Sequence, residues 1–138
     1  MKKILSLSLV LCICILALIS CSKVENDPVA MAQLLDEDGY YVELYLDESD
    51  IEDIAEEFEV TSQGVYCMLG AFPEEDEDEE KGGFFVFCDK TKNAKEVEED
   101  LNDVFDDLED EFGFSRMTVV RDGEVVFFGN EGMWEKLQ

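Results

Sequence analysis

The stretch Asn93–Phe112 reads NAKEVEEDLNDVFDDLEDEF and carries the clearest structural signal of the chain. Apolar residues recur in it at steps of three and four, which places them on one face of a helix. Its other face holds ten acidic residues and one lysine. Asn93 suits an N-cap, Glu96 completes a capping-box-like arrangement, and Gly113 suits the C-terminal end. We therefore expect an amphipathic helix, which packing must hold because its like charges repel. The apolar residues are Ala94, Val97, Leu101, Val104, Phe105, Leu108 and Phe112.

Shorter elements are predicted on both sides of this helix. Runs rich in β-branched and aromatic residues indicate strands over 40–47, 64–72, 83–89, 115–121 and 124–129. The last two form a hairpin around Asp122-Gly123, a pair typical of type I′ turns, with Arg121 opposite Glu124. Short helices are expected over 28–36 and from Ser49 or Asp50 to about residue 59, and a short helix or turn is expected over 131–138.

The order of these elements predicts the fold class. Its inner part, strand-helix-strand-strand-helix-strand, matches the split βαβ or ferredoxin-like pattern. The C-terminal hairpin would extend that sheet. We expect one small α+β domain over residues 28–138, with an antiparallel sheet and helices on at least one face.

Composition limits the function. The 138 residues include 36 acidic and 10 basic side chains and no histidine, for a net charge of −26. Nucleic acid and anionic membrane surfaces need basic patches, so both are disfavoured as partners. Histidine is the commonest general base and metal ligand. The sequence also has no phosphate-binding glycine loop, Gly-x-Ser-x-Gly or zinc-ligand spacing. We expect a protein that is not an enzyme and uses no cofactor.

The first twenty residues resemble a secretory signal. Lys2 and Lys3 precede an uncharged apolar run over Ile4–Ile19, which is a little short for a permanent membrane span. The run ends in Leu18-Ile19-Ser20-Cys21, which resembles the lipobox of bacterial lipoproteins. Cys12 and Cys14 do not fit that motif, because Leu11 and Ile13 precede them.

The resemblance implies that residues 1–20 are a lipoprotein signal peptide and that Cys21 receives a diacylglyceryl group. Residues 21–27 would then be a lipidated tether. The exported chain would keep 8 basic and 36 acidic side chains, for a net charge of 8 − 36 = −28. The implied location is the outer face of the cell membrane, or the outer membrane in a bacterium with two membranes. The alternatives are an unlipidated signal or an uncleaved anchor. The mature domain is similar to small acidic lipoproteins of unknown function.

Two cysteines of the domain fall on adjacent predicted strands. If Phe72 pairs with Gly83, Cys67 lies directly opposite Cys88, and export permits a disulfide between them. The alternative is two buried thiols.

The aromatic residues of the strands suggest an interaction surface. Strand alternation predicts apolar side chains on both faces of the sheet. The second face is covered by the terminal helices, by a partner or second copy, or by a glycan or small molecule. The candidate surface residues are Tyr41, Tyr45, Tyr66, Phe85 and Phe87.

Seven consecutive carboxylates separate two predicted strands. Ca²⁺ takes six to eight oxygen ligands, so this run is a cation candidate, although a solvated loop that binds cations diffusely is the simpler interpretation. The residues are Glu74, Glu75, Asp76, Glu77, Asp78, Glu79 and Glu80. We expect a lipid-anchored domain that binds a protein or another extracellular ligand, with a Ca²⁺-responsive acidic module as the alternative.

Overall fold

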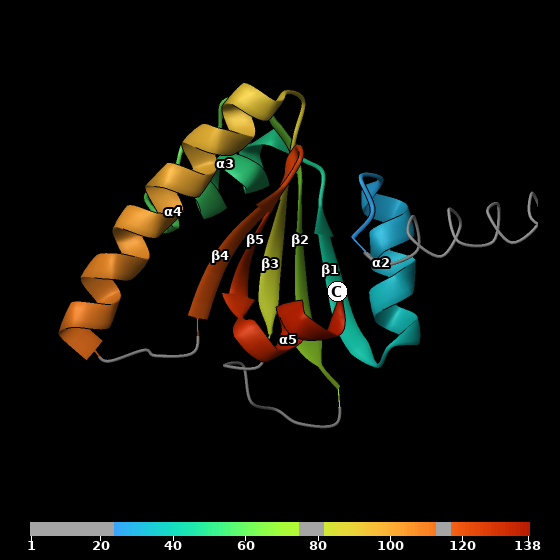
Figure 1. Cartoon of the computed structure of the whole chain (residues 1–138). Coiled ribbons are helices and arrows are strands. Elements are labelled where there is room, and N and C mark those ends of the chain that lie inside the picture. Colours follow the sequence, from blue (N-terminus) through green and yellow to red (C-terminus); the bar gives the residue numbers. More distant parts are fainter. Residues whose placement is uncertain (1–23, 75–81, 113–116) are drawn as a thin grey trace, which may run out of the picture.

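The computed structural model describes residues 24–74, 82–112 and 117–138, and within them it contains one five-stranded sheet and four helices (Figure 1). The helices are α2 (Pro28–Glu37), α3 (Glu48–Glu57), α4 (Thr91–Phe112) and α5 (Glu131–Lys136). The strands are β1 (Tyr40–Tyr45), β2 (Val65–Pro73), β3 (Gly83–Cys88), β4 (Met117–Asp122) and β5 (Val125–Asn130). The predicted α+β class and element order are confirmed.

The strands lie in the order β1-β2-β3-β5-β4, and every neighbouring pair is antiparallel. Because β5 is antiparallel to both β3 and β4, these two strands run parallel with β5 between them. Helix α4 connects them, so β3-α4-β4 is a split βαβ unit. Strands β1 and β2, which α3 connects, pair directly with each other. The split arrangement is therefore present once, and it includes the C-terminal hairpin.

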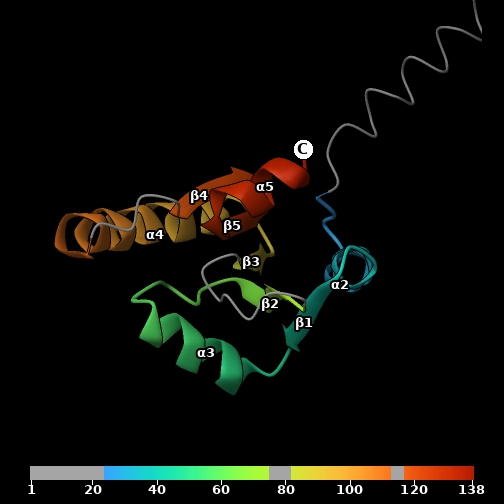
Figure 2. The same cartoon turned by 90° about the horizontal axis from the view of Figure 1, so that it is seen from below.

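Helices cover both faces of the sheet. Figure 2 shows α2 and α5 on one face and α3 and α4 on the other. The core under α2 and α5 contains Met31, Leu35, Tyr40, Cys67, Leu69, Ala71, Phe85, Phe87, Val125, Phe127, Met133 and Leu137. The core under α3 and α4 contains Ile51, Ala55, Met68, Val86, Cys88, Ala94, Val97, Leu101, Val126 and Phe128. The expectation that the terminal helices cover the second face is confirmed.

Acidic side chains cap the starts of α2 and α3. Asp27 accepts a hydrogen bond from the Val29 backbone at the start of α2, and Asp47 accepts one from Ser49 at the start of α3. The predicted caps of α3, Ser49 and Asp50, lie inside that helix. Asn93, the predicted cap of α4, also lies inside its helix, because α4 begins at Thr91.

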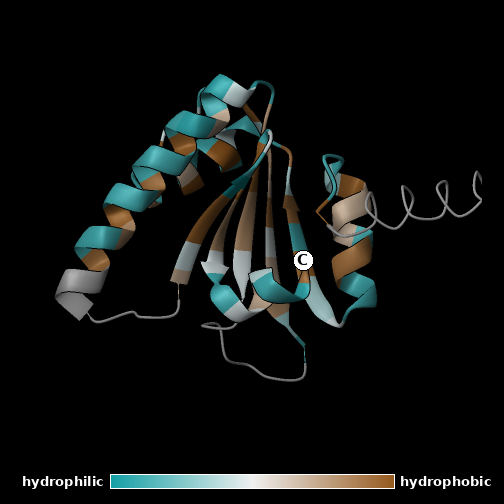
Figure 3. Ribbon diagram, in the orientation of Figure 1, coloured by the Kyte–Doolittle hydropathy of each residue, from teal (hydrophilic) through white to brown (hydrophobic). Residues whose placement is uncertain are grey.

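The apolar face of α4 packs on the sheet, whereas its acidic face is directed outward (Figure 3). The Asn93 side chain donates a hydrogen bond of 2.7 Å to Asp89 Oδ1, just before the helix.

The final hairpin is displaced by one residue from its predicted position. Asp122 pairs with Val125, so the turn consists of Gly123 and Glu124 instead of Asp122 and Gly123. Gly123 has φ +61°, and a positive φ at the first turn position is a feature that glycine tolerates. Arg121 therefore lies opposite Val126, and not opposite Glu124.

The predicted disulfide between Cys67 and Cys88 is wrong, because β2 and β3 pair one residue away from the expected register. Ala71, and not Phe72, pairs with Gly83, and an irregularity follows between Val65 and Cys67. A one-residue shift moves a side chain to the other face of a sheet. Cys67 thus lies under α2 and α5, Cys88 lies under α3 and α4, and both are buried free thiols.

Candidate functional site

Six aromatic residues lie on the face of the sheet that carries α3 and α4. We call them the aromatic strip: Tyr41, Phe58, Phe72, Phe84, Phe105 and Phe128. The register places Tyr41 opposite Phe72 and Phe84 opposite Phe128. Tyr41 lies on this face because side chains alternate along β1 and Tyr45 packs against the core under α3.

The five phenylalanine rings of the strip contact one another. The ring centroids of Phe72 and Phe84 are 5.9 Å apart, and those of Phe84 and Phe128 are 5.3 Å apart and stacked. Phe58 from the end of α3 and Phe105 from α4 approach Phe128 at 5.0 and 6.0 Å. These separations are typical of interacting aromatic pairs. Residues from three strands, α4 and the end of α3 therefore build one cluster.

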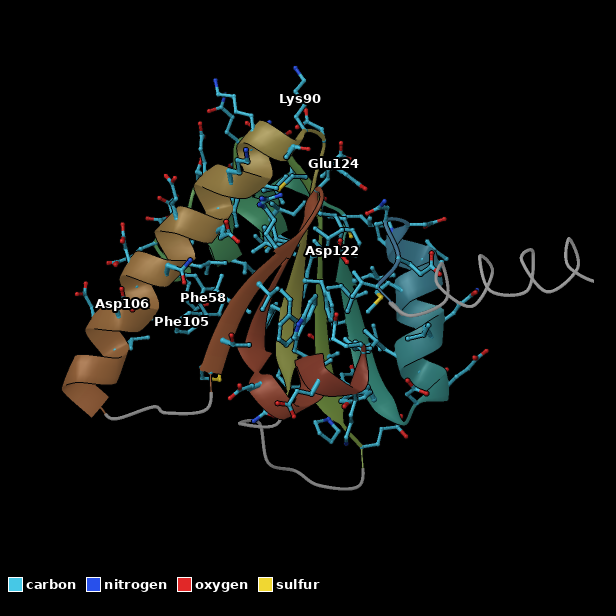
Figure 4. The ribbon with its side chains drawn as sticks, viewed as in Figure 1. Phe58, Lys90, Phe105, Asp106, Asp122 and Glu124 are labelled. Atoms are coloured by element: carbon cyan, nitrogen blue, oxygen red, sulfur yellow. The ribbon has the colours of Figure 1, made fainter. Side chains whose placement is uncertain are left out.

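The strip is only partly covered. Phe128 is buried, but Phe58, Phe72, Phe84 and Phe105 are half-buried, and Tyr41 at the β1 edge is 54% exposed. Figure 4 shows Phe58 and Phe105 beside the sheet below α4, whereas Asp106 extends from the helix toward solvent.

The course of α4 explains this exposure. Its N-terminal apolar residues Ala94, Val97 and Leu101 are fully buried against the sheet. Further along, Val104, Phe105 and Leu108 are only half-buried. Figure 1 shows that the C-terminal part of α4 leaves the sheet at an angle. The helix thus covers one end of this face and leaves the strip accessible toward the other end.

Glu43 fixes the two tyrosines at the edge of the strip. Its carboxylate accepts a hydrogen bond of 3.2 Å from the Tyr41 hydroxyl and another from the Tyr45 hydroxyl. The hydrogen bond to Glu43 is the main reason why the pKa of Tyr45 is raised to about 12. The pKa of Tyr41 is raised chiefly by its own hydrogen bond to Glu43. Both phenols stay protonated and hold their rings beside a negative charge.

Gly70 lies between Glu43 on β1 and Phe84 on β3, with which it pairs, and it adds no side chain to this face of the sheet. A Cβ at Gly70 would lie 3.2 Å from Phe84 Cε1, so the absent side chain lets the ring lie close to the backbone. Neither Glu43 nor Gly70 was predicted as a site residue from the sequence. The alternation Tyr41-x-Glu43-x-Tyr45 is the signal that would have revealed the carboxylate.

The structure divides the predicted interaction surface between the two faces. Tyr41 and Tyr45 lie at the strip, but Tyr66 lies on the opposite face, with its ring 6.4 Å from that of Phe87. Phe85 and Phe87 are fully buried in the core under α2 and α5. Their inclusion in an accessible surface was wrong, because the two terminal helices cover them.

The buried thiols are not suited to nucleophilic chemistry. Burial raises the pKa of Cys67 to about 11 and that of Cys88 to about 12, so both stay protonated at neutral pH. The thiolate is the reactive form of cysteine. These residues therefore act as small core side chains.

Several predicted features cannot be placed. Cys21 and residues 75–80 of the acidic run lie outside the described residues, and Glu74 is exposed. Within 24–74, 82–112 and 117–138, no three acidic or cysteine side chains are arranged to hold a metal ion. Among the helices of the same ranges, none is long and apolar enough to cross a membrane.

A cavity of about 320 Å³ lies at the other end of the same face, between the first turns of α3 and the segment before β2. Glu48, Glu52 and Gln63 contribute to its polar walls. It contains none of the strip residues, and we regard the strip as the candidate site.

Comparisons with family models, with curated proteins and with solved structures each found no match.

Proposed function

We propose that this chain is a lipid-anchored extracytoplasmic binding module that engages a partner protein through the aromatic strip. The observation that carries the proposal is the row of four half-buried phenylalanines that ends in the exposed ring of Tyr41. Exposed apolar patches bounded by polar residues mark interaction sites. Aromatic side chains also contribute much of the binding energy of protein interfaces.

The charge of the chain defines the chemistry of the partner. Glu43 lies at one end of the strip, and α4 carries acidic residues such as Asp106 beside Phe105. A segment that contains both lysine or arginine and aliphatic side chains complements this surface, because its cations pair with carboxylates and approach the faces of the rings. We propose a basic, apolar segment of an extracytoplasmic protein as the ligand.

The anchor is supported by the lipobox resemblance at Cys21. A tethered module meets its partners at the membrane surface, where a high local concentration compensates for modest affinity. Binding is favoured over catalysis because the sequence has no histidine and because the two described thiols are held in their protonated form.

The anchor is tested by substituting Cys21→Ala in the full chain expressed in a bacterium. We expect the protein to leave the membrane fraction, because its acyl chains are lost. The Cys12→Ala variant is the matched control, since Cys12 lies in the same apolar run without the lipobox pattern. Retention of the Cys21→Ala variant in membranes contradicts the lipid anchor.

The binding surface is tested with the lipidated protein in nanodiscs and a fluorescent peptide of alternating lysine and leucine. We expect Tyr41→Ser to weaken binding by about two- to tenfold, since one aromatic contact is worth about 0.5–1.5 kcal/mol. The control is Val29→Ser on α2, because Val29 is 53% exposed and Tyr41 is 54% exposed. Equal affinities of the two variants would exclude the strip as the binding surface.

A further inference from the structure

We infer that one end of the domain rests against the lipid headgroups, so that the open end of the aromatic strip is held away from the membrane. We call this region the tether end, and it comprises Leu44, Leu46, Tyr66, Lys90 and Lys92. The inference rests on the proposed lipid anchor at Cys21.

The length of the tether limits how far the domain can lie from the bilayer. Three residue steps separate Cys21 from Val24, and an extended chain spans at most about 3.6 Å per residue, or about 11 Å in all. The Val24 side chain packs against the core under α2 and α5. The headgroup region of one leaflet is itself about 5–8 Å thick. A domain anchored through Cys21 is therefore in contact with the headgroups near Val24.

Exposed apolar side chains surround the point where the tether enters the domain. The Tyr66 hydroxyl donates a hydrogen bond of 3.3 Å to the Asn26 carbonyl oxygen, which fixes Tyr66 beside the tether. Tyr66 is 47% exposed. Tyrosine is enriched at membrane interfaces, because its ring is apolar and its hydroxyl remains solvated.

The end of β1 brings two leucines to the same region. Tyr45, the last residue of β1, pairs with Met68 in the N-terminal half of β2. Leu44 is 37% exposed, and Leu46, directly after the strand, is 65% exposed, the largest exposed fraction of the large apolar side chains in the described residues. Figure 1 shows the chain entering α2 beside this end of β1. Apolar surface is thus concentrated where the membrane must lie.

Lysines are also concentrated at the tether end. The Asp89 backbone donates a hydrogen bond to the Gly64 carbonyl oxygen, so the start of α4 lies beside the start of β2. Three of the five basic residues in the described part of the chain, Lys90, Lys92 and Lys95, belong to this segment. Figure 4 shows Lys90 at the upper end of the domain, near Glu124. These ammonium groups can pair with lipid phosphates.

Acidic groups at the same end restrict the type of lipid. Asp27, Asp89 and Glu124 lie near Tyr66 and Lys90, so the tether end has mixed charge instead of a net positive charge. We therefore commit to zwitterionic headgroups as the contact surface. Tyr41 lies five residues before Leu46, or about 17 Å away along the strand. The strip opens toward the end of the sheet that faces away from the bilayer.

The test uses the lipidated full chain on phosphatidylcholine vesicles that contain brominated lipids. The native tryptophan is first removed by Trp134→Phe. A single tryptophan reporter is then introduced into this variant by Tyr66→Trp or, as the matched control, by Tyr41→Trp. We expect bromine to quench the reporter at position 66 at least about twofold more than the reporter at position 41, because only the first lies at the interface. Equal quenching would overturn the inference.

A second measurement needs no substitution. Hydrogen exchange of the wild-type lipidated chain is compared on vesicles and in detergent-free solution after enzymatic release of the lipid. Vesicles should protect residues 24–27 and 44–47 and leave 117–119, at the other end of the sheet, unchanged. Uniform protection of both regions would indicate self-association and contradict the orientation. If the wild-type chain does not sediment with vesicles, the anchor itself fails, and this outcome is distinct from equal quenching on bound protein.

Discussion

The two faces of the sheet have similar aromatic content but different degrees of closure. Under α2 and α5, Phe85, Phe87 and Phe127 are completely buried, and Trp134 stacks on Phe127. Under α3 and α4, only Phe128 of the strip is buried. Two short helices close the first face, whereas the longest helix in the described residues leaves the second face partly open. Coverage thus depends on the angle at which a helix crosses the sheet and not on its length.

Truncation of one phenylalanine on each face is the strongest test of this contrast. Phe127→Ala should lower the free energy of unfolding by about 3–5 kcal/mol, because it leaves a cavity in a closed core. Phe84→Ala should cost about 1–2 kcal/mol, since the half-buried ring has less area to lose. Urea denaturation measures both. Equal costs would mean that the strip is a closed core, and the proposed binding surface would then lose its basis.

Two glycines allow the opposite change, the addition of a methyl group on each face. A Cβ at Gly83 would lie 2.5 Å from Phe127 Cε2, inside the closed core. Gly83→Ala should therefore destabilise the protein by about 1–3 kcal/mol. Gly70→Ala should cost less than about 1 kcal/mol, because the half-buried Phe84 ring, 3.2 Å away, can shift toward solvent. The reverse order of the two costs, measured by thermal denaturation, would contradict the assignment of the open face.

The helix caps provide a smaller and more local comparison. Asp47→Ala and Asp27→Ala each remove a side-chain acceptor at a helix start and should cost about 1 kcal/mol. Hydrogen exchange should accelerate in α3 for the first variant and in α2 for the second. If either substitution accelerates exchange throughout the sheet, the two faces are coupled more tightly than their separate cores indicate.

The buried thiols predict a pH dependence that both faces share. The pKa of Cys67 rises from 9.0 to about 11 on folding, and that of Cys88 rises to about 12. The folded state therefore holds these protons more tightly, so the contribution to stability is complete below about pH 9 and is lost as the pH rises through 11 and 12. The melting temperature should fall over this range, and less so in a Cys67→Ala, Cys88→Ala variant.

The same thiols also test the register directly. Neither should react with a disulfide reagent near neutral pH until the protein is unfolded, and then both should react. A protein in which denaturant exposes no thiol would instead contain the disulfide that the structure contradicts.

The sequence predicted the elements of the fold more accurately than the contacts between strands. The period of the apolar residues in α4 is a local signal, and so is the alternation of strands with turn residues. The register of β2 and β3 is different, because the long connection from Pro73 to Gly83 does not fix it. One misplaced pair, Phe72 with Gly83, was enough to predict a disulfide between residues on opposite faces.

The candidate site was predicted only in part for a related reason. Tyr41 and Tyr45 could be identified because the alternation of β1 separates them from its apolar face. Phe85 and Phe87 could not be recognised as buried from their own strand, since α2 and α5, at the two ends of the chain, cover them. The row from Phe58 to Phe105 depends on the crossing angle of α4, which no local pattern specifies.

The position of β5 determines when the sheet can be completed. This strand lies inside the sheet, between β3 and β4, although it is formed by residues 125–130 near the end of the chain. During synthesis, the sheet lacks an interior strand until residues 125–130 have been added. The order of the strands along the chain therefore leaves β4 without its sheet neighbour until β5 has been made.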